Sequence, residues 1–186
     1  IVYYISAYCD LLEGGKIALG DKIDFCVPTG NFGNILAGYY AKHMGLPVGT
    51  LVCASNANNV LTDFLSTGTY DRNRPFYQTA SPSMDILISS NLERLLFDLC
   101  GRDDAQVRAW MDSLKQDGCY DVGRSMLNKL KTLFAAGCCN DSRTKMTIRE
   151  TYNNTHYLCD THTAVAVDVC KQYLLRTGDN LSLIHI

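Results

Sequence analysis

The segment from Pro28 to Asn34, which reads Pro-Thr-Gly-Asn-Phe-Gly-Asn, constrains the fold more than any other part of the chain. It follows an apolar stretch over residues 22–28, which we predict to be a buried strand. It precedes residues 34–44, where apolar side chains recur at helical spacing. Glycine lets the backbone turn sharply and approach a ligand closely, and the first N–H groups of a helix carry partial positive charge. We therefore expect this segment to hold a phosphate group.

The spacing of the two glycines is compatible with more than one kind of turn. The segment is neither the dinucleotide fingerprint Gly-x-Gly-x-x-Gly nor a Walker A loop, because no Lys-Ser or Lys-Thr follows. A Gly-x-x-Gly turn also occurs in KH domains, which bind single-stranded nucleic acid. A tight turn between a strand and a helix that holds no ligand fits the spacing equally well.

A second unit of the same kind follows in the sequence. A strand is predicted over residues 49–54 and a short helix over residues 60–65. Two successive strand–loop–helix units predict an α/β fold with a parallel sheet and helical crossovers. Residues 66–82 are rich in turn-forming residues and are predicted to form a loop. Further helices are predicted over residues 92–99, with Ser89 or Ser90 as N-cap, and over residues 103–117, 121–136 (with Phe134 on its apolar face) and 161–175.

Composition argues against several classes of protein. The formal net charge of −2 comes from 17 basic and 19 acidic side chains without a basic stripe, so nucleic acid and anionic membranes are not expected partners. No apolar run approaches the ~20 residues that cross a bilayer. The nine cysteines are odd in number and irregularly spaced, and most have apolar neighbours. We expect buried thiols, not a disulfide framework, and a reducing cytoplasmic setting.

A cluster of histidines and cysteines near the C-terminus invites comparison with a zinc site. His156, Cys159 and His162 are spaced by two residues, and Cys138 and Cys139 lie not far upstream. Imidazole and thiolate are the usual zinc ligands, but this spacing matches no standard finger. We therefore expect no metal site.

Longer motifs around the glycine segment resemble threonine synthase. The resemblance covers residues 1 to about 178. It implies an α/β pyridoxal-phosphate enzyme of fold type II, the tryptophan-synthase-β-like type. It also implies the conversion of O-phospho-L-homoserine and water to L-threonine and phosphate. The motifs that carry it are Val27–Asn34, Ala37–Lys42, Met44–Pro47, Cys53–Phe64, Thr67–Tyr70, Ser81–Ile86, Ser89–Arg94 and Cys159–Ala166.

The same resemblance implies particular site residues. Thr163 would place its hydroxyl beside the pyridine nitrogen, and a neutral hydroxyl at that point, in place of a carboxylate, would leave the nitrogen largely unprotonated. Asp85, Glu93 and Arg94 could be catalytic acids or a substrate clamp, but adjacent charged residues on a helix are more often a solvated, ion-paired face. The resemblance raises only slight interest in Ser83, Asp85 and Asn91. The residues expected to hold the cofactor phosphate are Gly30, Asn31, Phe32, Gly33 and Asn34.

The chain also departs from the family's pattern. In the family the Schiff-base lysine lies well upstream of the glycine segment, and none of the eight lysines here has that context; Lys42 is expected on a solvated helix face. We therefore expect a C-terminal part of the enzyme over residues 1–178 that lacks the catalytic lysine and is inactive alone. Thr161 stands where the family usually has proline, and it could cap the following helix. Residues 179–186 are expected to be a truncated end or a foreign tail.

Two other functions are compatible with the sequence. One is a non-catalytic module that binds a phosphate or a nucleotide through the same loop. The other is a different pyridoxal-phosphate lyase of this fold type, such as threonine dehydratase, against which the long Ser81–Arg94 motif argues. The oligomeric state is not fixed by the sequence.

Overall fold

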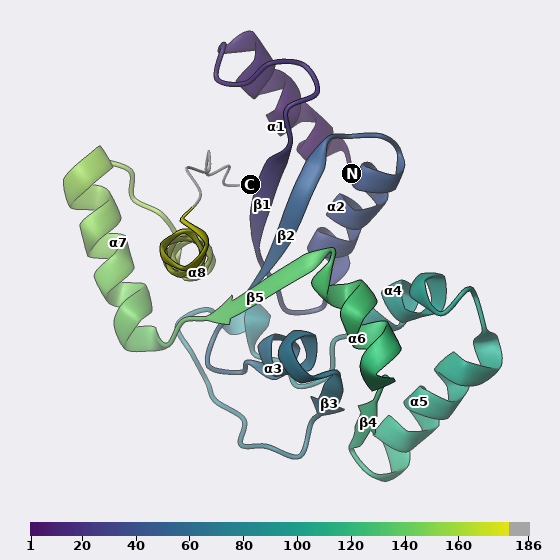
Figure 1. Ribbon diagram of the computed structural model, residues 1–186. Helices are drawn as coiled ribbons and strands as arrows, with labels where there is room; N and C mark the ends of the chain where they lie inside the picture. The colour runs from purple at the N-terminus through teal and green to yellow at the C-terminus, as the bar shows by residue number, and fades with distance from the viewer. Residues whose placement is uncertain (179–186) are drawn as a thin grey trace.

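The computed structural model describes residues 1–178, so the tail predicted over residues 179–186 lies outside the described residues. Helices and strands alternate along much of the chain (Figure 1). The helices are α1 (Val2–Glu13), α2 (Gly33–His43), α3 (Val60–Thr67), α4 (Leu92–Leu99), α5 (Asp104–Gln116), α6 (Gly123–Lys131), α7 (Asp141–Thr155) and α8 (Thr161–Thr177). The strands are β1 (Ile23–Pro28), β2 (Val48–Ser55), β3 (Thr69–Asp71), β4 (Cys119–Asp121) and β5 (Phe134–Cys138), and Pro82–Met84 form a single 3-10 turn.

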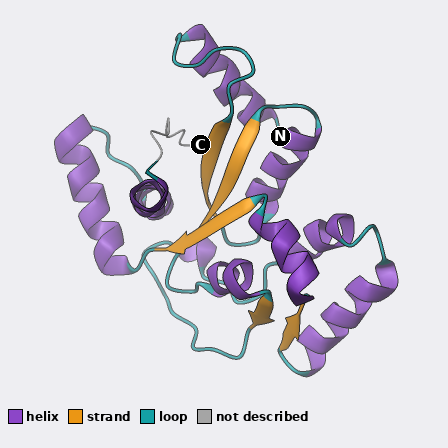
Figure 2. Cartoon of the chain, viewed as in Figure 1, coloured by secondary structure: helices purple, strands orange, loops and turns teal. Residues whose placement is uncertain are grey.

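A parallel sheet with the strand order β1-β2-β5 lies at the centre, between helices (Figure 2). Its register places Cys26 beside Val52 and Val52 beside Ala135. A separate antiparallel pair joins β3 to β4. The α/β fold with a parallel sheet, predicted from the sequence, is confirmed.

Apolar side chains cover both faces of the parallel sheet. On one face, α8 packs across all three strands, and Val165 and Val169 join Val52 in one buried cluster. On the other face, α2 and α3 pack against the strands around Phe25 and Leu51. Because both faces are buried, the strands read as nearly continuous apolar runs in the sequence.

Helix α1 is anchored to α2 by one buried tyrosine. Tyr4 is 1% exposed, and its ring packs edge-on against Phe25 with 4.8 Å between the ring centroids. A Cβ atom at Gly38 would lie 2.7 Å from Tyr4 Cε1, so only glycine allows this approach. The Tyr4 hydroxyl donates to the backbone oxygen of Asn34 (2.9 Å) and to Asn34 Oδ1 (3.2 Å). The N-terminal helix thus reaches the end of the glycine segment.

Two expectations about secondary structure were wrong, and one helix was missed. The helix predicted over residues 121–136 ends at Lys131, and Phe134 opens the third strand of the parallel sheet. The loop predicted over residues 66–82 contains β3, whose partner β4 lies far along the chain. Helix α7 was not predicted, because its sequence is polar and its buried residues are threonines, Thr144 and Thr147.

Helix α7 is held to α8 by a buried carboxylate. Asp168 is 2% exposed and accepts hydrogen bonds from Arg143 Nε (2.9 Å) and Gln172 Nε2 (2.7 Å). Burial raises the pKa of the Asp168 carboxyl, but the hydrogen bonds from Arg143 and Gln172 outweigh burial and lower it overall. The carboxylate therefore stays ionised and paired at neutral pH.

Three of the four thiols that were predicted to be buried are buried. Cys26, Cys53 and Cys170 are buried free thiols, as predicted, and burial raises the pKa of Cys53 to about 12. Cys100 is only partly buried.

Lys42 does not lie on a solvated face: its Nζ donates to the Gly49 oxygen at 2.6 Å, and partial burial lowers its pKa. Among residues 1–178, no helix is both long enough and apolar enough to cross a membrane.

Candidate functional site

The glycine segment leaves β1 at the carboxyl edge of the parallel sheet. Thr29 N–H donates to the Ala54 oxygen at the end of β2 (2.8 Å), and Thr29 Oγ1 donates to the Val27 oxygen (2.7 Å). In open α/β sheets, ligands bind outside the carboxyl ends of the strands. The segment therefore lies where this architecture places a binding site.

Phe32 fixes the turn of the glycine segment. It is the residue before α2 and adopts the left-handed conformation with φ 62°, which is uncommon for a residue other than glycine. Its side chain is 1% exposed and lies against Phe134, with 5.6 Å between the ring centroids. A strained backbone held by a buried ring is typical of a ligand-binding turn.

The carbonyl groups of the segment are turned back into the protein. Ser89 Oγ donates to the Gly30 oxygen (2.8 Å), and Asn91 Nδ2 donates to the Asn31 oxygen (2.8 Å). Within residues 1–178, none of the backbone N–H groups from Gly30 to Ile35 donates to a protein acceptor, and the first helical bond of α2 runs from Leu36 N to the Phe32 oxygen. The segment therefore presents donors and the positive end of a helix on its outer side.

Both glycines allow a close approach, but not by taking positive φ values. A Cβ atom at Gly30 would lie 3.0 Å from the Ser83 oxygen, and one at Gly33 would lie 3.3 Å from Asn91 Nδ2. The sequence predicted glycine for a sharp turn, whereas the left-handed position belongs to Phe32. The glycines instead let the segment containing Ser83 and Asn91 support the loop from behind.

The side chains of Asn91 and Ser89 therefore bond to the loop, and neither makes a capping hydrogen bond to α4. The prediction that Ser89 or Ser90 caps α4 was wrong, because Asn91 is the N-cap residue. Its side chain makes no capping hydrogen bond, and its Nδ2 group donates instead to the Asn31 oxygen.

Asn34 is oriented by Tyr4. Since the Tyr4 hydroxyl donates to Asn34 Oδ1 (3.2 Å), the Nδ2 group of Asn34 is the side-chain donor left for a ligand. Asn31 and Asn34 are both exposed at the outer side of the loop.

Asp85 is the centre of a polar network that the sequence did not reveal. Its Oδ1 accepts hydrogen bonds from Asn56 Nδ2 (2.7 Å), Asn58 Nδ2 (3.0 Å) and Thr79 Oγ1 (2.7 Å). Its Oδ2 accepts from Thr79 N–H (2.8 Å). Asn56 and Asn58 are 1% and 5% exposed. The expectation that Asp85 lies on a solvated face was wrong, because it joins the loop after β2 to the turn that backs Gly30.

The start of α8 completes the neighbourhood. Thr161 is the first residue of the helix and not its cap; Asp160 is the N-cap, and its Oδ1 accepts from His162 N (2.8 Å) and Thr163 N (3.1 Å). The hydroxyl of Thr163, which is 7% exposed, donates to Asp160 Oδ2 at 2.5 Å. His162 Nε2 accepts from Ser83 N–H at 3.3 Å. Ser83 therefore links the first turn of α8 to the segment that lies behind the glycine segment.

Partial burial raises the pKa of the Asp160 carboxyl, but hydrogen bonds from the Thr163 hydroxyl and from two N–H groups outweigh it and lower the pKa to about 2. At pH values above 3.8, the ordinary pKa of an aspartate, the ionised carboxylate therefore stabilises the start of α8. This contribution is lost as the pH falls towards 2. We expect the ¹³C NMR signal of this carboxyl to titrate near pH 2, and at a higher pH after Thr163→Val, because the hydroxyl bond is lost while the two N–H donors remain. A midpoint near 3.8 in the unchanged chain would contradict the hydrogen-bonding pattern.

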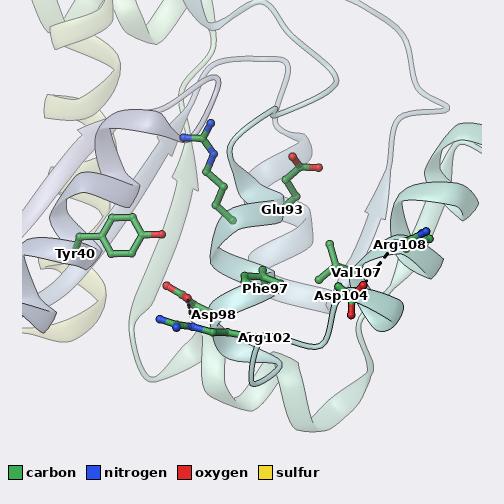
Figure 3. Close-up of a pocket in the computed structure, with 9 residues that line it drawn as sticks. Tyr40, Glu93, Phe97, Asp98, Arg102, Asp104, Val107 and Arg108 are labelled. Carbon is green, nitrogen blue, oxygen red and sulfur yellow. Dashed lines mark hydrogen bonds and ion pairs between the residues drawn. The ribbon is translucent and has the colours of Figure 1, made fainter.

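The other candidate residues do not come together in one site. In the part of the chain that the structure describes, no group of three or more histidine, cysteine or acidic side chains is placed to hold a metal ion. Glu93 and Arg94 are exposed on α4, as expected. They line an open cavity of about 560 Å³ between α2, α4 and α5, together with the ion pairs Arg102–Asp98 and Arg108–Asp104 (Figure 3). None of the residues predicted to hold the cofactor lines it.

Known proteins are similar in sequence to this chain over most of its length. Threonine synthase-like 1 of Homo sapiens is 46% identical over 167 residues, which cover 89% of this chain and 22% of that protein. Threonine synthase of Pseudomonas aeruginosa is 41% identical over 172 residues, 92% of this chain and 35% of that protein. No protein-family model matches the chain.

The solved structures agree. A crystal structure of threonine synthase from Brucella melitensis with pyridoxal phosphate bound aligns with a TM-score of 0.86 and 44% identity, covering 92% of this chain and 36% of that one. The resemblance to threonine synthase predicted from the motifs is confirmed, and the fold is that of these pyridoxal-phosphate enzymes. The chain spans between 22% and 38% of the length of the curated relatives it matches.

Proposed function

We propose that this chain, which is similar to threonine synthases along nearly its whole length, supplies the phosphate-binding part of a pyridoxal-phosphate site. The enzyme would convert O-phospho-L-homoserine and water to L-threonine and phosphate. The observation that carries the proposal is the row of backbone N–H groups from Gly30 to Ile35, which donate to no protein acceptor in residues 1–178. It is supported by the pyridoxal phosphate bound in the similar structure from Brucella melitensis.

The residues present fit the cofactor. A phosphate group would accept hydrogen bonds from the N–H groups of Asn31, Phe32, Gly33 and Asn34, and the α2 dipole would stabilise its negative charge. Nδ2 of Asn34, directed away from Tyr4, would add a side-chain donor. Ser89 and Asn91 would keep the carbonyl groups of the segment away from the phosphate. When bound, pyridoxal phosphate supplies an electron sink that stabilises negative charge on the substrate's carbon atoms.

The covalent anchor of the cofactor would come from another part of the polypeptide. The lysines with side-chain hydrogen bonds in the described residues direct them elsewhere: Lys42 to Gly49, Lys129 to Leu99 and Lys171 to Glu150. We therefore propose that this chain alone binds the phosphate end of the cofactor and does not catalyse the reaction. Borohydride treatment in the presence of pyridoxal phosphate should leave the chain without covalently attached cofactor. Stoichiometric attachment at one of its own lysines would refute this part of the proposal.

Gly33→Val tests the assignment of the loop. The new side chain would push Asn91 away from Asn31, because a Cβ atom there already lies 3.3 Å from Asn91 Nδ2. We expect affinity for pyridoxine 5′-phosphate, a ligand that needs no lysine, to fall by at least tenfold in calorimetric titration of the longest natural polypeptide carrying this chain.

Ala105→Val is the matched control, because it adds a β-branched side chain at an exposed position of α5 remote from the loop. Its affinity should equal that of the unchanged protein. Equal affinity for Gly33→Val would show that the ligand does not bind at this loop.

A further inference from the structure

We propose that Tyr4 is a positioning residue of the phosphate site, and that helix α1 and a ligand at the glycine segment stabilise each other through it. This inference rests on the proposed function, because it takes the outer side of the glycine segment to be the place where phosphate binds. It goes further by giving a part in binding to α1, a helix that lies beside α2 and outside the segment itself (Figure 1).

The hydroxyl of Tyr4 holds two oxygens of a single residue. It donates to the backbone oxygen of Asn34 at 2.9 Å and to Asn34 Oδ1 at 3.2 Å. A hydroxyl group has one proton to donate, so the two oxygens share it in a three-centre hydrogen bond. The bond therefore fixes the main chain and the side chain of Asn34 together, with Nδ2 on the side away from Tyr4.

Tyr4 is itself held in place, so it can act as a fixed point for Asn34. Its ring is buried and packs edge-on against Phe25 of β1. Glycine at position 38 leaves room for the ring, since a Cβ atom there would lie 2.7 Å from Tyr4 Cε1. Burial holds the pKa of the Tyr4 hydroxyl well above its usual value, so the hydroxyl keeps its proton and remains a donor at neutral pH.

The orientation of the Asn34 amide matters to an anion. Asn34 is exposed, so without a partner its amide would turn freely and present either its NH₂ group or its oxygen. A phosphate oxygen accepts hydrogen bonds and would be repelled by the amide oxygen. Because Tyr4 occupies Oδ1, the NH₂ group is directed outward before the ligand arrives. The entropy cost of ordering this side chain on binding is thereby reduced.

The effect must also run from the ligand to α1. This helix has 12 residues, no acidic residue in its first turn and no basic residue in its last, and its buried residues are Tyr4 and Tyr8. An isolated helix of this length is marginal in water, so α1 depends on being docked. Coupling between two binding events is reciprocal. If docked α1 raises the affinity for phosphate, bound phosphate stabilises the docking of α1 by the same factor.

The test compares Tyr4→Phe with Tyr8→Phe in the longest natural polypeptide that carries this chain. Each variant keeps its ring and loses one buried hydroxyl of α1, but the Tyr8 hydroxyl accepts from Gly20 N–H and does not reach the glycine segment. In calorimetric titration with pyridoxine 5′-phosphate, Tyr4→Phe should lower the affinity by about threefold to tenfold, the range of one hydrogen bond. Tyr8→Phe should leave the affinity unchanged.

Two further measurements separate positioning from a loss of structure. In an Asn34→Ala background, Tyr4→Phe should lower the affinity much less than it does alone, because the side chain that Tyr4 orients is gone. In the unchanged protein, the ligand should slow hydrogen exchange of the α1 amides, with those of α5 as the reference. Tyr4→Phe should remove this slowing, whereas Tyr8→Phe should keep it.

The outcomes distinguish the inference from the proposed function. Equal affinities of Tyr4→Phe and the unchanged protein, equal losses in Tyr4→Phe and Tyr8→Phe, or α1 exchange that the ligand does not slow would each overturn the inference alone. The proposed function would then still stand on the loss of affinity in Gly33→Val. Absence of any binding of pyridoxine 5′-phosphate to the unchanged protein overturns the proposed function, and the inference with it.

Discussion

Phe134→Ala is expected to lower the free energy of unfolding by about 3–5 kcal/mol, the usual cost of truncating a buried phenylalanine. Phe134 is 5% exposed at the start of β5 and packs against Phe32. The cavity would therefore open directly beneath the left-handed residue of the glycine segment. Urea denaturation followed by circular dichroism measures the change, and ligand affinity of the folded fraction should fall with it.

The control for this substitution is Phe76→Ala. Phe76 is 54% exposed, and substitutions at such positions usually change stability by within about 0.5 kcal/mol. Phe134→Leu serves as a milder variant that stays folded. If Phe134→Ala were as stable as Phe76→Ala, the placement of Phe134 in the sheet core would be wrong.

Asp85→Ala is expected to destabilise the protein by about 2–4 kcal/mol. A hydrogen bond to a charged group contributes about 1.5–3 kcal/mol, and Asp85 accepts four. The loss is smaller than the sum, because Asn56 and Asn58 each keep a second acceptor, in Ser81 and Tyr77. Since Asp85 holds the turn behind Gly30, affinity for pyridoxine 5′-phosphate should also fall. Denaturation and calorimetric titration measure the two effects.

Asp112→Ala removes an exposed carboxylate from α5 and should change neither quantity. Asp85→Asn is the more delicate variant, because its amide keeps one acceptor but faces the Thr79 N–H with a donor. Its effect should lie between those of the other two variants. Unaltered stability and affinity in Asp85→Ala would mean that the network does not support the loop.

The sequence sufficed for the parts of the fold whose signals are local. The strands before and after α2 are apolar runs bounded by turn residues, and the glycine segment stands between the first of them and its helix. Phe134 failed as a prediction because its spacing from Leu130 fits a helical face, while the chain leaves the helix at Lys131 without a glycine or proline to mark the end.

The sequence predicted only that part of the candidate site whose residues are adjacent in the chain. The residues of the glycine segment are adjacent in sequence, whereas Asp85 gathers partners from two separate loops, and no spacing rule joins Asn56 to Thr79. The role of Asp160 was likewise hidden. Its neighbour Thr161 is also a good capping residue, and only the backbone geometry shows which of the two precedes the helix.

The strand order of the parallel sheet has a consequence for how the protein folds. Strands β1 and β2 are joined by a short crossover through α2, so the glycine segment belongs to a unit with local contacts. Strand β5 and helix α8 reach the same sheet only after the chain has passed through residues 56–133. Closing a long loop costs more entropy, and distant pairings slow folding. We therefore expect hydrogen-exchange protection to develop first in the β1–α2–β2 unit and later at Thr163, so that the glycine segment and the start of α8 form at different times.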